Sequence, residues 1–125
     1  MRVPQTQADV VELSRQVDGL FAAAFSVTHD LGPPAMAYIA DAFDPAHGDM
    51  VKVASRAICE ACRRAAVNRR LFVQKLGRPD FPTWVVVAVP VVEADVVRAA
   101  FGVILNCVDE ADCRRRIGRL EALAE

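Results

Sequence analysis

The sequence predicts an α+β domain in which a small antiparallel sheet is flanked by helices. The chain has 125 residues, which fits one domain over residues 1–125. Hydrophobic residues make up 54% and charged residues 25%, so a chain of this size can build a core without metal or disulfides. Apolar residues at helical spacing recur in three segments, and a run rich in β-branched residues lies between two of them.

The first segment, residues 6–28, is expected to form an amphipathic helix. Thr6 with Asp9 three residues later is a loose capping box at its start. Its apolar face follows the three-and-four spacing of a helix and consists of Val10, Leu13, Val17, Leu20, Phe21 and Ala24.

Residues 35–43 fit either a short helix or a strand, and the helix is favoured. The reason is the spacing of four apolar residues after Pro33 and Pro34, namely Met36, Ile39, Ala40 and Phe43.

A second helix is predicted over residues 50–68, and a short strand over residues 71–73. The apolar face of this helix consists of Val51, Ala54, Ile58, Ala61, Cys62 and Ala65.

Residues 84–106 are predicted to form the central hairpin, and residues 110–124 the last helix. The first strand, Trp84–Val92, is dense in valine and should be buried on both faces. The sequence Glu93-Ala94-Asp95 is expected to turn into a second strand that runs to Leu105. Gly102 in that strand marks either a bulge or a close contact.

The chain is expected to be cytoplasmic and not to cross a membrane. Its first residues lack the apolar core of a signal peptide. The longest apolar stretch, residues 84–107, contains Pro90 and three central charges at Glu93, Asp95 and Arg98, which are unfavourable at membrane depth. In a cytoplasmic protein the four cysteines should be reduced.

Charge is distributed unevenly along the chain. The net charge is −1, but residues 51–78 hold eight basic and one acidic residue, while the segments before and after carry −5 and −3. At 100° per residue, four basic side chains fall within about 40° of one another on a helix, at Lys52, Arg56, Arg63 and Arg70. This basic ridge is either a surface for an acidic partner, phosphate or nucleic acid, or a solvated helix face. Nucleic acid is not expected, since aromatic residues are not interleaved with these bases.

The cysteines allow two interpretations. Cys59 and Cys62 form a CxxC, and together with Cys107 and Cys113 they could hold zinc or an iron–sulfur cluster, or act as redox sensors. However, the CxxC falls inside a predicted helix, where such cysteines commonly serve as small hydrophobic core residues. His29 and His47 lie in no HExxH pattern, and no nucleophile elbow or P-loop motif occurs, so catalysis is not supported and the cofactor is left open.

The segment VAVPVVEADVVRAAFGVIL, residues 87–105, resembles the central hairpin of GAF-type sensory domains. It is also similar to the effector domains of IclR-type regulators and to PAS-like sensors. The resemblance covers the C-terminal third and includes a closing helix over residues 109–125. It implies a GAF/PAS-like fold with a ligand cavity between the sheet and a helical lid. In such domains the N-terminal helix commonly pairs with a second copy, and the apolar stripe of residues 10–25 could either do that or pack on its own sheet. The implied ligand positions are Tyr38, Phe43, Phe72, Trp84, Val86, Ala88 and Phe101.

The leading hypothesis is therefore a non-enzymatic sensory or regulatory domain. It would be dimeric, would bind a small ligand against the sheet and would signal to a protein partner through its terminal helices. One alternative is a cysteine-based metal or redox protein. The other is an interaction subunit that uses the basic ridge.

Overall fold

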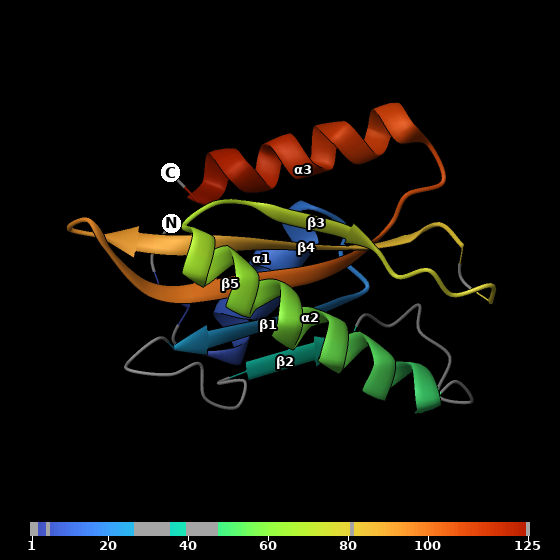
Figure 1. Cartoon of the computed structure of the whole chain (residues 1–125), viewed down its shortest axis with the longest axis horizontal. Helices are drawn as coiled ribbons and strands as arrows, with labels where there is room; N and C mark the ends of the chain where they lie inside the picture. The colour runs from blue at the N-terminus through green and yellow to red at the C-terminus, as the bar shows by residue number, and fades with distance from the viewer. Residues whose placement is uncertain (1–2, 5, 27–35, 40–47, 81, 125) are drawn as a thin grey trace.

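Three helices and five strands make up the described part of the chain. The structure, a computed structural model, describes residues 3–4, 6–26, 36–39, 48–80 and 82–124. The elements follow in the order α1-β1-β2-α2-β3-β4-β5-α3 (Figure 1). All pairings are antiparallel, and the sheet order is β2-β1-β5-β4-β3. The predicted α+β class, with a small antiparallel sheet flanked by helices, is confirmed.

The first helix, α1 (Gln7–Gln16), is much shorter than predicted. Its start is as expected, because the Thr6 hydroxyl accepts from the Asp9 amide and the Asp9 carboxylate accepts from the Thr6 amide, each at 3.2 Å. The helix then ends in a turn in which Asp18 has a φ of 52° and the Gly19 amide donates to the Ser14 carbonyl at 2.9 Å. The predicted helix over residues 6–28 is therefore wrong from residue 17 to residue 26, and residues 27 and 28 lie outside the described residues.

Part of that predicted helix is the strand β1 (Phe21–Ser26). Its residues 21–25 are all buried, because the strand lies in the interior of the sheet with covering elements on both faces. A segment that is apolar at every position satisfies helical spacing as well as strand spacing, so periodicity alone could not separate the two.

The segment favoured as a helix over residues 35–43 contains the strand β2 (Met36–Ile39). The helix prediction is wrong and the strand alternative is correct for these four residues. β2 pairs with β1, with Ile39 opposite Phe21 and Met36 opposite Ala24. The hydrogen-bonded pairing with β1 decides the conformation of this segment. The spacing of apolar residues within residues 35–43 could not reveal that pairing.

The second helix and the following strand match their predictions closely. α2 spans Gly48–Asn68 and β3 spans Phe72–Lys75. α2 ends because Arg69 adopts a φ of 55° and the Arg70 amide turns back to the Ala65 carbonyl at 3.2 Å, a Schellman-type end.

The predicted central hairpin is confirmed as β4 (Trp84–Glu93) and β5 (Val96–Asn106), and the last helix is α3 (Glu110–Ala124). Ala94 and Asp95 form a two-residue turn with φ values of 52° and 62°, as a type I′ hairpin requires. The register shifts between Val91 and Val92, so the irregularity is not at Gly102. Within the described ranges, no helix combines the length and apolar character needed to cross a membrane.

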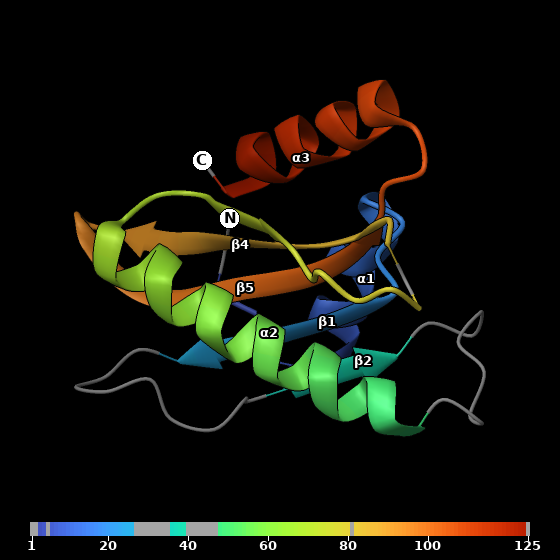
Figure 2. The same ribbon diagram turned by 45° about the vertical axis from the view of Figure 1, so that its right-hand side comes forward.

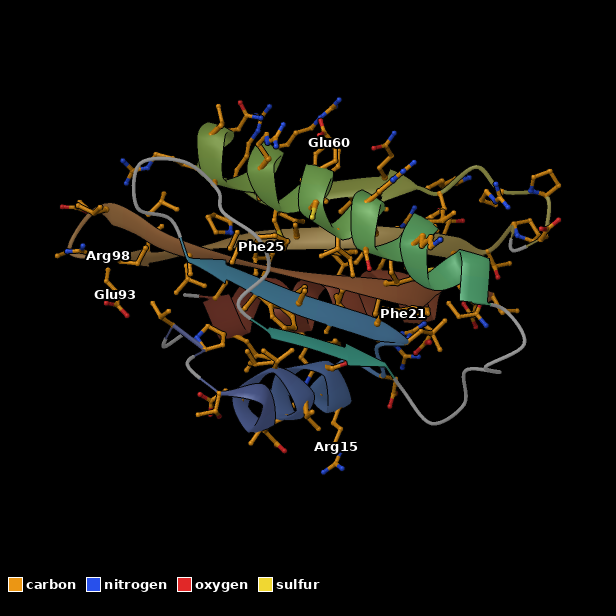
Figure 3. The ribbon with its side chains drawn as sticks, turned by 90° about the horizontal axis from the view of Figure 1, so that it is seen from below. Arg15, Phe21, Phe25, Glu60, Glu93 and Arg98 are labelled. Carbon is orange, nitrogen blue, oxygen red and sulfur yellow. A yellow bond between two sulfur atoms is a disulfide. The ribbon has the colours of Figure 1, made fainter. Side chains whose placement is uncertain are left out.

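The sheet has a hydrophobic core on each face. α2 covers one face, where its small residues pack against β1, β4 and β5, and α1 lies on the opposite side of the sheet (Figure 3). α1 and α3 share that second core, with Val10, Val17 and Leu120 buried among the other faces of the same strands. α3 runs alongside β4 (Figure 2). The apolar stripe of α1 thus packs on its own sheet, the alternative to self-pairing.

α2 packs tightly against the sheet at Gly102. A Cβ atom there would lie 2.7 Å from Ile58 Cγ2 and 2.8 Å from Cys62 Sγ. Gly102 pairs with Ala23 on one side and Ala88 on the other, so a row of small residues crosses three strands beneath the helix. The expected role of Gly102 as a close contact is therefore confirmed.

Arg116 fastens α3 to the rest of the domain. Its guanidinium donates to the carbonyls of Val17 and Asp18 at 3.3 Å each, and also to the Asn106 carbonyl. Its Nε lies 3.2 Å from the Asp112 carboxylate. One side chain therefore joins α3, the α1–β1 turn and the end of β5.

Replacing Gly102 by alanine should destabilise the fold. The added methyl group must displace Ile58 and Cys62, which overpacks the core and should lower the free energy of unfolding by about 1–3 kcal/mol. Gly118→Ala is the matched control, because Gly118 lies in α3 with nothing within 4 Å of its Cβ position. Alanine should raise the unfolding free energy there by about 0.5–1 kcal/mol. Urea unfolding of both variants checks this, and equal stability of Gly102→Ala and the parent protein would contradict it.

Candidate functional site

The predicted ligand positions do not converge on one cavity. Trp84 and Phe72 lie on the α2 face of the sheet, whereas Phe101 is fully buried in the core on the α1 and α3 face. The side chain of Tyr38 and all of Phe43 lie outside the described residues. Two faces of one sheet cannot line a common pocket, so these positions cannot all contact one ligand.

Trp84 belongs to the packed core rather than to an open site. Its side chain is 7% exposed, and its ring lies 6.0 Å from that of Phe21 at an angle of 59°. Such tilted aromatic pairs stabilise a core by more than their buried area alone. Phe21 and Phe25 both lie on the side of β1 that faces α2 (Figure 3).

An open pocket of about 470 Å³ lies where α2 leads into β3. Its position is set by the end of α2 and by the edge strand β3, which has one neighbour in the sheet. Of the predicted ligand residues whose side chains the structure describes, Phe72 lines it. The described lining is Arg64, Asn68, Arg70, Leu71, Phe72 and Val73.

Arg64 is held in place at this pocket. Its guanidinium carbon lies 5.3 Å from the centre of the Phe72 ring, and its Nε donates to the Glu60 carboxylate at 3.1 Å. The ion pair is exposed and contributes little stability, but together with the ring it restricts the orientation of the guanidinium. Glu60 itself points away from the sheet (Figure 3).

The connection from α2 to β3 is anchored to the far hairpin. Arg69 Nη2 donates to the Asp95 carbonyl at 2.7 Å, joining the end of α2 to the β4–β5 turn. Sequence reasoning missed Arg64, Asn68 and Arg69 as site residues. The available signal was the doubled arginines, Arg63-Arg64 and Arg69-Arg70, on either side of the expected helix end at Asn68.

The predicted basic ridge is shorter than expected. Lys52, Arg56 and Arg63 are exposed on α2, as a solvated or partner-binding face requires. Arg70 is not on the helix, because α2 ends at Asn68 and Arg69 turns the chain out of helical geometry. Arg70 instead lines the pocket beside β3.

The structure separates the four cysteines into two pairs. Cys107 and Cys113 form a disulfide that links the segment after β5 to the first turns of α3, so the expectation that all four are reduced is wrong. Cys59 and Cys62 are free on α2, across the sheet from that disulfide. Among the described residues, no three His, Cys, Asp or Glu side chains are grouped to hold a metal ion, so the four-cysteine metal site is not assembled.

Cys62 behaves as a core residue. It is fully buried, and desolvation raises the pKa of its thiol far above the usual value, with Cys59 adding a smaller effect in the same direction. Partial burial also raises the pKa of the Cys59 thiol, and the nearby Arg63 lowers it by less. Neither thiol is activated as a nucleophile, because a reactive cysteine needs a lowered pKa.

No protein-family model and no curated protein matches the sequence. Solved structures do match the fold. The GAF domain/HD domain protein from Geobacter sulfurreducens is 15% identical with a TM-score of 0.50, over 96% of this chain and 90% of that chain. The nlh2 GAF domain of A. aeolicus in an inactive state is 8% identical with a TM-score of 0.55, over 95% of this chain and 77% of that chain.

An enzyme is among the structural matches. The type II free methionine-R-sulfoxide reductase from Thermoplasma acidophilum is 12% identical with a TM-score of 0.52, over 94% of this chain and 86% of that chain. The chain therefore has a GAF-like fold, and the likeness extends well beyond the C-terminal third that carried the sequence resemblance. These identities establish the fold alone.

The buried Cys62 thiol should make stability fall at alkaline pH. Since the raised pKa keeps this thiol neutral in the folded state, its contribution is complete at pH values well below 9.0, the ordinary pKa of an exposed thiol. Above that pH the unfolded chain gains by ionising, and on the order of 1 kcal/mol should be lost by pH 9.5. Urea unfolding from pH 7 to 9.5, compared with Cys62→Ala, isolates this loss. A parallel decline in both proteins would refute the assignment.

Proposed function

We propose that this chain is a non-enzymatic regulatory domain that binds a small ligand and passes the binding event to a protein partner, as a dimer. The observation that carries the proposal is the GAF-like fold, which matches GAF domains of other proteins over nearly the whole chain. Within this fold, α2 is the element that connects an open pocket to the centre of the sheet.

The packing of α2 supports this role physically. The side chains of Ile58 and Cys62 on α2 fill the space directly over Gly102, so a displacement of α2 must move β5 or open a void. A ligand that binds one position of α2 more tightly than another would shift the population of both elements together. α3 and α1 lie on the opposite face of the same strands. In this proposal they are the elements that contact the partner.

Native mass spectrometry of the purified protein tests this function. The expected result is a dimer mass with an organic small molecule that is lost on denaturation. A monomer that carries stoichiometric metal, lost in Cys59→Ser/Cys62→Ser, would replace this proposal with a metal-binding function. A monomer without ligand, which also gains none on incubation with a cell extract of small metabolites, would contradict the proposal.

Redox sensing is a second candidate, favoured by the Cys107–Cys113 disulfide. Two-electron reduction by a dithiol would break the S–S bond, convert both sulfurs to thiols and leave the dithiol oxidised. The released segment is the connection between β5 and α3, so the first turns of α3 would lose a covalent attachment to the sheet.

Reduction with dithiothreitol should lower the free energy of unfolding by about 2 kcal/mol, because the loop closed by the disulfide is short. Urea unfolding with and without dithiothreitol measures the difference. Cys107→Ala/Cys113→Ala is the control and should not respond to the reductant, while Cys59→Ser should respond as the parent does. Equal stability of the oxidised and reduced parent protein would remove the disulfide as a sensor.

A further inference from the structure

The pocket at the junction of α2 and β3 presents mainly hydrogen-bond donors. Two arginines and an asparagine supply its polar groups, and Leu71, Phe72 and Val73 supply the apolar part of the lining. Its volume lies within the range of small-molecule sites, while its exposed lining is more polar than apolar and it is open to solvent.

Arg64 has N–H groups that are available for hydrogen bonds to a ligand. Its Nε is engaged by Glu60, whereas within the described ranges no hydrogen bond is made by Nη1 or Nη2. The contact with the Phe72 ring keeps the guanidinium plane at the pocket wall. A guanidinium that is fixed before binding loses less conformational entropy when it binds, so it contributes more to affinity.

The backbone position of Arg70 is fixed by the turn that follows α2. The preceding residue, Arg69, has a positive φ, and the Arg70 amide is bonded to Ala65. The Arg69 side chain holds the Asp95 carbonyl at 2.7 Å. The turn is thus held by a backbone hydrogen bond and by the Arg69 side chain, which fixes the backbone of Arg70 at the pocket lining.

These donors select an anion. Arginine carries a permanent positive charge and a planar set of N–H groups that match two oxygens of a carboxylate or phosphate. The pocket lies in the segment of residues 51–78, which has a net charge of +7. Nucleic acid is disfavoured, because the exposed Glu60 carboxylate beside Arg64 would repel an extended phosphate backbone.

We infer that the pocket between α2 and β3 binds a small molecule through a carboxylate or phosphate group, held by Arg64, Asn68 and Arg70. This inference rests on the proposed ligand-binding function and names the ligand class and its location. Phe72 and Leu71 contact the uncharged part of the same molecule. Binding at this position draws the end of α2 toward β3 and so acts on the helix that packs on Gly102.

Isothermal titration calorimetry of the full chain tests the ligand class. The probes are citrate for a carboxylate, adenosine monophosphate for a phosphate, and adenosine as the uncharged counterpart of the latter. At least one of the two anions should bind at one site, and adenosine should bind at least tenfold more weakly than its monophosphate. Tighter binding of citrate identifies a carboxylate ligand, and tighter binding of the monophosphate identifies a phosphate ligand.

Variants test the location. Arg64→Ala and Arg70→Ala should each lower the affinity for the anion at least tenfold. Arg64→Lys keeps the positive charge but loses the planar guanidinium, so its affinity should lie between those of the alanine variants and the parent protein. Arg56→Ala is the matched control, since Arg56 is exposed on α2 outside the pocket lining. An unchanged unfolding midpoint shows that each variant is folded. Equal weakening by Arg56→Ala would overturn the inference.

The failure of this inference differs from failure of the proposed function. If neither anion binds the ligand-free parent, or if a short single-stranded oligonucleotide binds far more tightly than both, the anion pocket is overturned. If native mass spectrometry finds a small molecule that is retained equally by Arg64→Ala/Arg70→Ala, the regulatory function stands and the location is overturned. If no small molecule is bound by any of these proteins, both are overturned.

Discussion

The distance between α2 and the sheet is the constraint on which the rest of this structure depends. Gly102 in β5, flanked by Ala23 in β1 and Ala88 in β4, leaves room for the side chains of Ile58 and Cys62 but not for a Cβ of its own. Three other buried residues of α2 are also small, namely Ala54, Ala61 and Ala65. Helix and sheet therefore meet in one tight seam, which fixes the position of α2 along its length.

This seam explains why the open space lies at the end of α2. Under the middle of the helix the packing is filled by Ile58 and Cys62, whereas past Asn68 the chain turns away and leaves a gap beside the edge strand β3. This turn and the β4–β5 turn both have an energetic cost. Arg69 in the first, and Ala94 and Asp95 in the second, adopt left-handed φ values, each unfavourable by roughly 1 kcal/mol for a residue with a Cβ. The Arg69–Asp95 hydrogen bond joins these strained turns. Strain that the surrounding structure maintains is commonly found near functional sites.

The sequence was sufficient to predict the elements whose periodicity is unambiguous. α2, the β4–β5 hairpin and α3 follow from apolar spacing and from a dense run of valine, and Gly102 was identified as a close contact or bulge. β1 could not be recognised, because a strand buried on both faces is apolar at every position and also satisfies helical spacing. β2 depends on β1 as its pairing partner. Because β1 was not recognised as a strand, β2 was not favoured as one either.

The candidate site was harder to predict than the fold. Phe72 was identified through the family resemblance, but the arginines around it come together only because α2 ends at Asn68 and Arg69 reverses the chain. The faces of Trp84 and Phe101 depend on strand register, which one sequence does not reveal when both faces are apolar. The Cys107–Cys113 pairing required the position of α3 against the end of β5, a tertiary relation that spacing alone does not determine.

The central claim is that a ligand acts on this GAF-like fold from the end of α2 and not from beneath it. An NMR titration of the backbone amide chemical shifts tests the claim most directly. The titrant is whichever of citrate and adenosine monophosphate binds the protein. The largest early changes are expected at residues 64–73, with smaller changes spreading to Gly102 through the packing of α2. Changes that are largest at Ala23, Ala88 and Gly102, with residues 64–73 unaffected, would place the ligand beneath the helix and contradict the claim.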